Sequence, residues 1–163
     1  IEVNVMPGKG VLQMTGQMGD VMKESAQIAL TYVRSVASDY GVKENYFEKH
    51  DIHLHIPEGA VPKDGPSAGI TMATAMLSAV TGRKVLPRVA MTGEVTLRGH
   101  VLMIGGLKEK LLAARMAQVE KVLVPAKNQP DVEELSKEIT KGMEIVYIKE
   151  MNEVIREAFV PEK

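Results

Sequence analysis

A serine stands where a loop rich in proline and glycine meets an apolar run. The loop covers residues 57–66, Ser67 follows it, and an Ala-, Met- and Leu-rich stretch then continues to Gly82. We predict a helix over 67–80, buried nearly all round. Free N–H groups in a helix's first turn favour an anion, so Ser67 could attack a carbonyl while neighbouring amides stabilise the oxyanion. On position alone, capping the helix is the commoner role for such a serine.

A serine that attacks a carbonyl needs a base to take its proton. Two lysines near the start of another predicted helix, Lys108 and Lys110, are candidates for this base. Burial and the positive end of the helix dipole both favour the neutral amine, which can activate a serine. Lys110 shares its helix rows with alanines at 113, 114 and 117, whereas Lys108 shares its rows with bulkier residues. An alanine stripe lets another element approach closely, so Lys110 is the better candidate. A solvated face remains the common environment of a helix lysine.

Histidine offers two alternatives to a lysine base. The GPSAG segment fits the G-x-S-x-G pattern of α/β-hydrolases, but His100 is the only histidine after Ser67 and the order serine, acid, histidine is not met. A triad that uses His53 or His55, oriented by Asp64, stays open. The two histidines could also hold a metal with a third ligand, but no H-E-x-x-H motif is present. Partly buried, hydrogen-bonded histidines are the more common outcome.

Composition narrows the class of protein. The chain has 163 residues, 45% hydrophobic and 25% charged, with a net charge of -1. This favours one compact domain over 1–163, with an aliphatic core because aromatics make up only 4%. The absence of cysteine excludes disulfides, cysteine-ligated zinc and a thiol nucleophile. Nothing indicates nucleic acid or a membrane as a partner, and we expect a cytoplasmic protein.

Hydrophobic periodicity predicts an alternation of helices and strands. An opening strand leads through a Gly-rich passage to Asp20, a candidate helix cap, and Arg98-Gly99 is expected to turn a hairpin. The later alternation predicts at least one parallel βαβ unit and a mixed α and β class. The predicted helices are 21–40, 67–80, one after Gly106, 131–141 and 151–159, and the predicted strands are 51–56, 85–91, 95–104, 119–124 and 143–148.

Two further features concern the wider protein. The chain opens on strand-like alternation at Ile1 without an initiator methionine, which suggests a C-terminal fragment of a longer polypeptide. No G-x-x-x-x-G-K-[ST] loop occurs, so the chain does not itself look like an ATPase.

Three segments in this order, PKDGPSAG, MTGEVTLRG and IGGLKEKLLAA, resemble the proteolytic domain of Lon proteases, and the resemblance covers nearly the whole chain. It implies that Ser67 is the nucleophile and Lys110 the base of a serine endopeptidase. The supporting residues that it implies are Thr92 beside the lysine amine, the loop residue Asp64, the strand residues His53 and His55, and Glu94 of the TGE segment. Oxyanion donors are expected among the backbone amides of the Gly65, Pro66 and Ser67 region.

The resemblance also implies properties beyond the site. These are an α+β fold with mixed sheets and packed helices, related to the second domain of ribosomal protein S5, and a homo-oligomer in the form of a hexameric ring. The substrates would be unfolded or damaged proteins, in quality control and the stress response. No metal or cofactor is expected in this domain, whereas ATP and Mg would bind an upstream AAA+ module. The main rival is a noncatalytic peptide-binding or oligomerisation domain that kept the protease fold. A stand-alone Lon-like peptidase is a third possibility.

Overall fold

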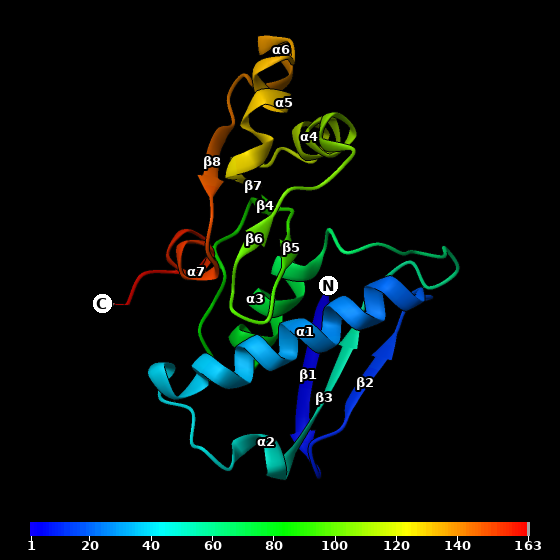
Figure 1. Ribbon diagram of the computed structural model, residues 1–163, viewed down its shortest axis with the longest axis vertical. Helices are drawn as coiled ribbons and strands as arrows, with labels where there is room; N and C mark the ends of the chain where they lie inside the picture. The colour runs from blue at the N-terminus through cyan, green and yellow to red at the C-terminus, as the bar shows by residue number, and fades with distance from the viewer. Residues whose placement is uncertain (163) are drawn as a thin grey trace.

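One small sheet forms the N-terminal end of the molecule. In the computed structural model, which describes residues 1–162, the middle strand β3 (His50–His55) pairs antiparallel with β1 (Glu2–Pro7) and parallel with β2 (Leu12–Thr15) (Figure 1). Ile52 and Leu54 are buried, while the histidines between them are partly exposed. The alternation that predicted this strand therefore points the aliphatic side chains into the core.

Two helices pack beside this sheet. The amphipathic α1 (Asp20–Val36) lies against α3 (Gly69–Thr81), in which no side chain is exposed. The predicted helix over 21–40 is corrected at its end, since residues 37–40 form a 3-10 turn, η1, that stops at Gly41 with a φ of 80°. The predicted start at Ser67 is also corrected. The cap of α3 is Ala68, so Ser67 lies two residues before the helix and does not cap it.

A second, parallel sheet carries the other half of the molecule. Its strands are β4 (Val89–Met91), β7 (Lys121–Pro125) and β8 (Glu144–Ile148), in the order β4-β7-β8. Helix α4 (Leu107–Met116) lies in the connection from β4 to β7. The short helices η2 (Ala126–Asn128), α5 (Gln129–Glu133) and α6 (Lys137–Thr140) connect β7 to β8. The predicted parallel βαβ arrangement is confirmed.

Several predicted elements are shorter or divided. Residues 85–88 do not join β4, because Pro87 cannot donate to a ladder and Val85 instead bridges Phe159. The predicted helix over 131–141 breaks at Ser136, whose side chain accepts a hydrogen bond from Glu138 N and starts α6. In each case, a local side chain or a missing N–H overrides the hydrophobic pattern.

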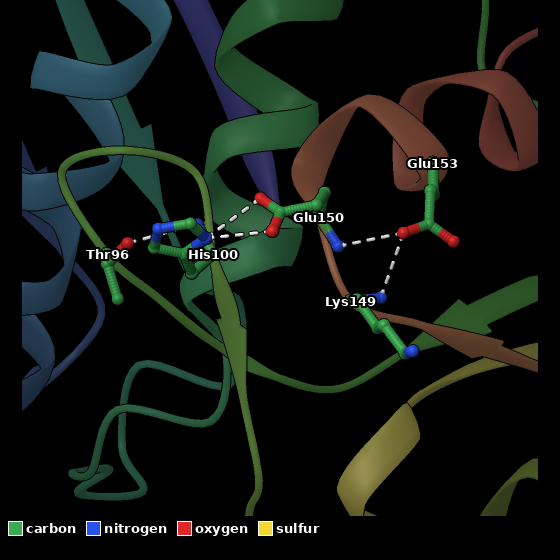
Figure 2. A network of polar contacts seen from close by, with 5 residues as sticks. All are labelled: Thr96, His100, Lys149, Glu150 and Glu153. Atoms are coloured by element: carbon green, nitrogen blue, oxygen red, sulfur yellow. Dashed lines mark hydrogen bonds and ion pairs between the residues drawn. The ribbon is translucent and has the colours of Figure 1, made fainter.

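The C-terminal helix is tied to a hairpin that follows β4. Strands β5 (Glu94–Val95) and β6 (Val101–Leu102) confirm the predicted hairpin, although they have two residues each and the turn runs from Thr96 to Gly99, with Leu97 and Arg98 at its centre. His100 Nδ1 lies 2.8 Å from a carboxylate oxygen of Glu150, the residue that caps α7 (Met151–Ala158) (Figure 2). Gly99, with a φ of 82°, lets the hairpin turn lie close to α1, because a Cβ there would lie 2.5 Å from the Tyr32 ring.

Buried side chains form two hydrophobic clusters. The larger cluster joins the first sheet to α1, α3 and α7, and the smaller one lies around α4 and β7. The short helix α2 (Tyr46–Lys49) contributes Phe47 to the larger cluster. The whole is a mixed α and β architecture with small sheets and packed helices, and no helix in residues 1–162 is both long and apolar enough to cross a membrane.

Candidate active site

Ser67 lies in a segment whose backbone is hydrogen-bonded to the TGE segment. The Ser67 carbonyl accepts hydrogen bonds from Gly93 N at 2.9 Å and from Thr92 Oγ1 at 3.3 Å. Ile70 N donates in turn to the Gly93 carbonyl at 3.2 Å. The two sequence segments that stood out for their chemistry therefore run side by side, and the carbonyl of Ser67 is held by two donors of the TGE segment.

Thr92 connects Ser67 to Lys110. Its side chain is buried, with 5% exposed, and its hydroxyl accepts a hydrogen bond from Lys110 Nζ at 3.1 Å while donating to the Ser67 carbonyl. A hydroxyl has one proton to donate and lone pairs to accept with, so both bonds can exist together. Thr92 is thus positioned to fix the direction of the lysine amine.

Lys110 is partly buried, whereas Lys108 is exposed. Burial lowers the pKa of Lys110 below its ordinary value of 10.5. The prediction that Lys110 is the desolvated lysine is confirmed, but the alanine stripe explains only part of it. Ala114 is buried, whereas Ala113 and Ala117 are exposed.

Ser67 and Lys110 line one cavity of about 220 Å³. The remaining lining is largely apolar and comes from α3, β4, α4 and β7. In residues 1–162 the Ser67 hydroxyl makes no direct hydrogen bond to the Lys110 amine. Contacts between catalytic groups are often loose without substrate, so a shared cavity is the relevant geometric test. The lining residues are Ser67, Ala68, Thr71, Ala90, Met91, Thr92, Leu107, Lys110, Leu111, Ala114 and Val122.

Asp64 organises the loop before the serine. Its Oδ1 accepts hydrogen bonds from Met22 N at 2.9 Å and from Gly65 N at 2.8 Å, and these bonds lower the pKa of its carboxyl. Asp64 therefore satisfies an amide in the first turn of α1. The predicted cap, Asp20, is instead the first residue of the helix, and Gly19 stands at the cap position without a side chain. No ion pair joins Asp64 to Lys110 within residues 1–162.

Lys63 is a structural residue of this loop that the sequence pattern did not reveal. Its Nζ donates to the carbonyls of Gly16, Glu58 and Val61 at 2.8–3.0 Å. Its backbone also bonds to Gln17 and Gly19. A lysine between proline and aspartate reads as an exposed loop residue, so only the folded path of residues 57–66 shows that its ammonium cross-links them.

The two strand histidines belong to a separate contact. Thr15 Oγ1 lies 2.8 Å from His53 Nε2 and 2.7 Å from His55 Nδ1. Neither ring bonds to Asp64 or Ser67 in the described part of the chain, so the histidine triad has no geometric support. Residues 1–162 also contain no group of three or more acidic, His or Cys side chains placed to hold a metal.

The backbone amides near Ser67 differ in their availability. Pro66 has no N–H, and Gly65 N is bonded to Asp64. The N–H groups of Ser67 and Ala68 have no hydrogen-bond partner within residues 1–162. They are the amides free to meet a negative charge at this site. Glu94 does not line the Ser67 and Lys110 cavity and instead borders a different one, together with Pro66.

Asn128 supports the entry to α4 from inside the smaller cluster. It is fully buried, its Oδ1 accepts from Ile104 N at 3.0 Å, and its Nδ2 donates to the Ile104 carbonyl at 2.9 Å. This pairing satisfies the backbone three residues before Leu107, the first residue of α4. A single Asn in a short turn carries no periodic signal, so sequence reasoning missed it.

Known proteins with similar sequences identify the family of this chain. The model of the Lon protease (S16) C-terminal proteolytic domain matches residues 1–161. The chain is 66% identical over 160 residues to a Lon protease of Lachnoclostridium phytofermentans and 53% identical over 163 residues to Lon protease 1 of Bacillus subtilis. These alignments cover 98% and 100% of the chain, but only 20% and 21% of the relatives. The chain belongs to the family of Lon protease C-terminal proteolytic domains.

Proposed function

We propose that this chain is a serine endopeptidase in which Ser67 is the nucleophile and Lys110 is the general base. The observation that carries the proposal is the shared cavity, where a partly buried lysine with a lowered pKa stands beside a serine that follows a rigid loop. A neutral amine can accept the serine proton, whereas an ammonium cannot.

The reaction runs through an acyl-enzyme. Lys110 Nζ takes the proton from Ser67 Oγ as the oxygen attacks the scissile carbonyl carbon, and the resulting ammonium then protonates the leaving amine. In the second step the neutral amine takes a proton from water, whose oxygen attacks the ester carbonyl; the bond to Ser67 Oγ then breaks, and the Lys110 ammonium returns the proton to Ser67 Oγ. Lys110 must move into hydrogen-bond reach of Ser67 when substrate binds, and its bond to the Thr92 hydroxyl keeps it aimed while it does so.

The negative charge on the carbonyl oxygen needs backbone donors. Within residues 65–67, Ser67 has a free N–H, Pro66 has no N–H, and Gly65 contributes mainly by its turn conformation at a φ of 105°. We assign the oxyanion contact to Ser67 N–H, with Ala68 N–H as a second donor. Asp64 acts on this step indirectly, because it holds the loop against the start of α1.

A serine-directed probe tests this assignment. A fluorophosphonate should label the chain at Ser67, as located by peptide mass mapping, and the labelling rate should rise with pH because the neutral form of Lys110 is the reactive one. Lys110→Met should suppress labelling while the chain stays folded. Labelling at another serine, or undiminished labelling of the Lys110→Met variant, would remove the dyad.

The wider role is an inference from the relatives. The chain spans about a fifth of the length of the Lon proteases it matches. We infer that it works in a longer, ATP-dependent protease, in which an AAA+ module binds ATP and Mg and delivers unfolded or damaged proteins. The hexameric ring, the cytoplasmic location and the relation to domain 2 of ribosomal protein S5 stay predictions, as does a single domain over 1–163.

A further inference from the structure

A second cavity lies on the other side of the loop that carries Ser67. Its volume is about 170 Å³, and it is bordered by α1, by β5 and by Pro66, the residue next to Ser67. Part of its wall is aliphatic, formed by Val21, Ile28 and Val95. This space can hold several water molecules, at about 30 Å³ each, or one extended side chain in their place.

The rest of the wall is acidic. Glu24 reaches the cavity from α1 and Glu94 from β5, and no lysine or arginine lines it. Across residues 1–162, neither carboxylate takes part in an ion pair or a side-chain hydrogen bond. Glu94 is nevertheless partly buried. A partly buried carboxylate without a partner is uncommon unless a ligand supplies one.

A third polar group of the wall also lacks a partner. Ser25 is 4% exposed, and its Oγ is a buried oxygen without a hydrogen bond in the described part of the chain. The hydroxyl lies against the first residue of α3, since a Cβ on Gly69 would stand 2.9 Å from it. The wall of the cavity therefore contacts Gly69, which follows Ser67 by two residues.

The chemistry of this lining selects an amphipathic cation. Two carboxylates and a serine hydroxyl accept hydrogen bonds, and the aliphatic wall suits an alkyl stem. A metal ion fits less well because residues 1–162 supply no group of three acidic, His or Cys ligands. A lysine or arginine side chain matches both parts, with its stem along Val21 and Ile28 and its charge between Glu24 and Glu94.

We propose that the cavity formed by Glu24, Ser25, Glu94 and their aliphatic neighbours is a subsite for a basic side chain of the bound polypeptide. It rests on the proposed function, since it takes Ser67 as the point where the polypeptide is cut. Pro66 lines the subsite and directly precedes Ser67 in the chain, and successive residues of an extended peptide advance about 3.3 Å. The basic residue therefore lies within one or two positions of the scissile bond.

Binding to the Ser67→Ala variant tests the subsite without requiring catalysis. The ligands are matched peptides that carry a single lysine at each of six successive positions, each paired with a norleucine peptide that keeps the alkyl stem and removes the charge. At one position, the lysine peptide should bind about fivefold more tightly than its norleucine partner, as expected for a partly exposed charge pair. Adding Glu24→Gln and Glu94→Gln together should make the two peptides bind equally.

The control is Glu144→Gln, which removes one charge from an exposed position at the start of β8 and should leave the ratio unchanged. Equal binding of lysine and norleucine peptides at all six positions overturns the subsite. A preference for lysine that survives the double substitution also overturns the subsite, because the cation then binds elsewhere. Failure of every peptide to bind at millimolar concentration counts against it in the same way. Labelling of Ser67 in the wild-type chain is a separate measurement, so the dyad can stand when the subsite fails.

Discussion

The two residues of the proposed dyad come from halves of the molecule that are stabilised differently. Ser67 belongs to the half with the larger hydrophobic cluster, where backbone hydrogen bonds fix the residues on both sides of it. Lys110 belongs to α4, a ten-residue helix on the smaller cluster, whose outer face leaves Leu112 38% and Met116 86% exposed. The nucleophile is held by its own backbone, whereas the base is held mainly by the packing of one short helix.

In the lysine half, one contact sets the start of α4 and another sets the direction of the lysine amine. The pairing of Asn128 with Ile104 fixes where α4 begins, and the Thr92 hydroxyl fixes where the lysine ends. Changes in the serine half should act through the loop, and changes in the lysine half should act through the position of α4. The following substitutions test that division.

The largest effect is expected at Lys110 itself. Lys110→Arg should reduce peptide hydrolysis by at least about a thousandfold, because a guanidinium does not lose its proton in a protein. Lys110→Met should be equally inactive but should melt at a higher temperature than the wild type at neutral pH, since it removes an ammonium whose burial is unfavourable. Peptide turnover and thermal melting measure the two effects. Turnover by Lys110→Arg close to wild type would show that another group is the base.

Thr92→Val should reduce turnover by about ten- to a hundredfold, because the amine loses its orienting hydroxyl while its neighbours remain. The pH profile gives a second measurement. Wild-type activity should rise with pH through the lowered pKa of Lys110 and then level off, since the base is active when its proton is lost. The variant should keep this rising shape at a lower plateau. A profile that falls with pH over the same range would contradict a lysine base.

Asn128→Ala should unfold the protein more easily, by about 2 to 4 kcal/mol, because both the N–H and the carbonyl of Ile104 lose their buried partner. Activity should fall in proportion to the loss of ordered α4. The exposed neighbour provides a matched control, and Gln129→Ala should change stability little. Chemical denaturation measures both, and equal stability of the two variants would show that the clamp on Ile104 contributes nothing.

Asp64→Asn should lower the melting temperature at neutral pH by weakening the bonds to Met22 N and Gly65 N. The pKa of the Asp64 carboxyl is lowered in the folded chain, so its contribution is present above the ordinary aspartate value and is lost as pH falls through the folded value. The difference between variant and wild type should therefore shrink in acid. A difference that is constant with pH would assign the effect to packing instead.

Lys108→Arg should have the smallest effect, with turnover and melting temperature near the wild-type values, because this side chain is exposed. The same assays as for Lys110→Arg provide the measurement. An inactive Lys108→Arg beside an active Lys110→Arg would reverse the assignment of the two lysines.

Hydrophobic alternation and turn residues were sufficient to predict most elements of the fold. The β3 strand, the buried α3, the hairpin of β5 and β6 and the parallel β7 and β8 follow from local patterns of about ten residues. The errors occur where one side chain changes the path of the backbone. Pro87 shortened a strand and Ser136 divided a helix, and neither outcome is visible in the apolar periodicity.

The candidate site divides in the same way. The residue types pointed to Ser67 and Lys110, the resemblance added Thr92, and the fold brings the three together around one cavity. The positions of Lys63, Thr15 and Asn128 could not be predicted. Each bonds to a group 24 to 47 residues away in sequence, and such pairings depend on the tertiary path.

The tie between the hairpin and α7 has a consequence for synthesis of the chain. Met151 N donates to the Gly99 carbonyl, Val101 N donates to the Lys149 carbonyl, and α7 packs against α3 in the larger cluster. A ribosome makes α7 after Ser67 and Lys110, so the growing chain contains both reactive groups before it contains this helix. We expect a nascent chain lacking α7 to have an incomplete core and no assembled cleft. The cavity that holds Ser67 and Lys110 would thus be complete only after α7 has packed against α3.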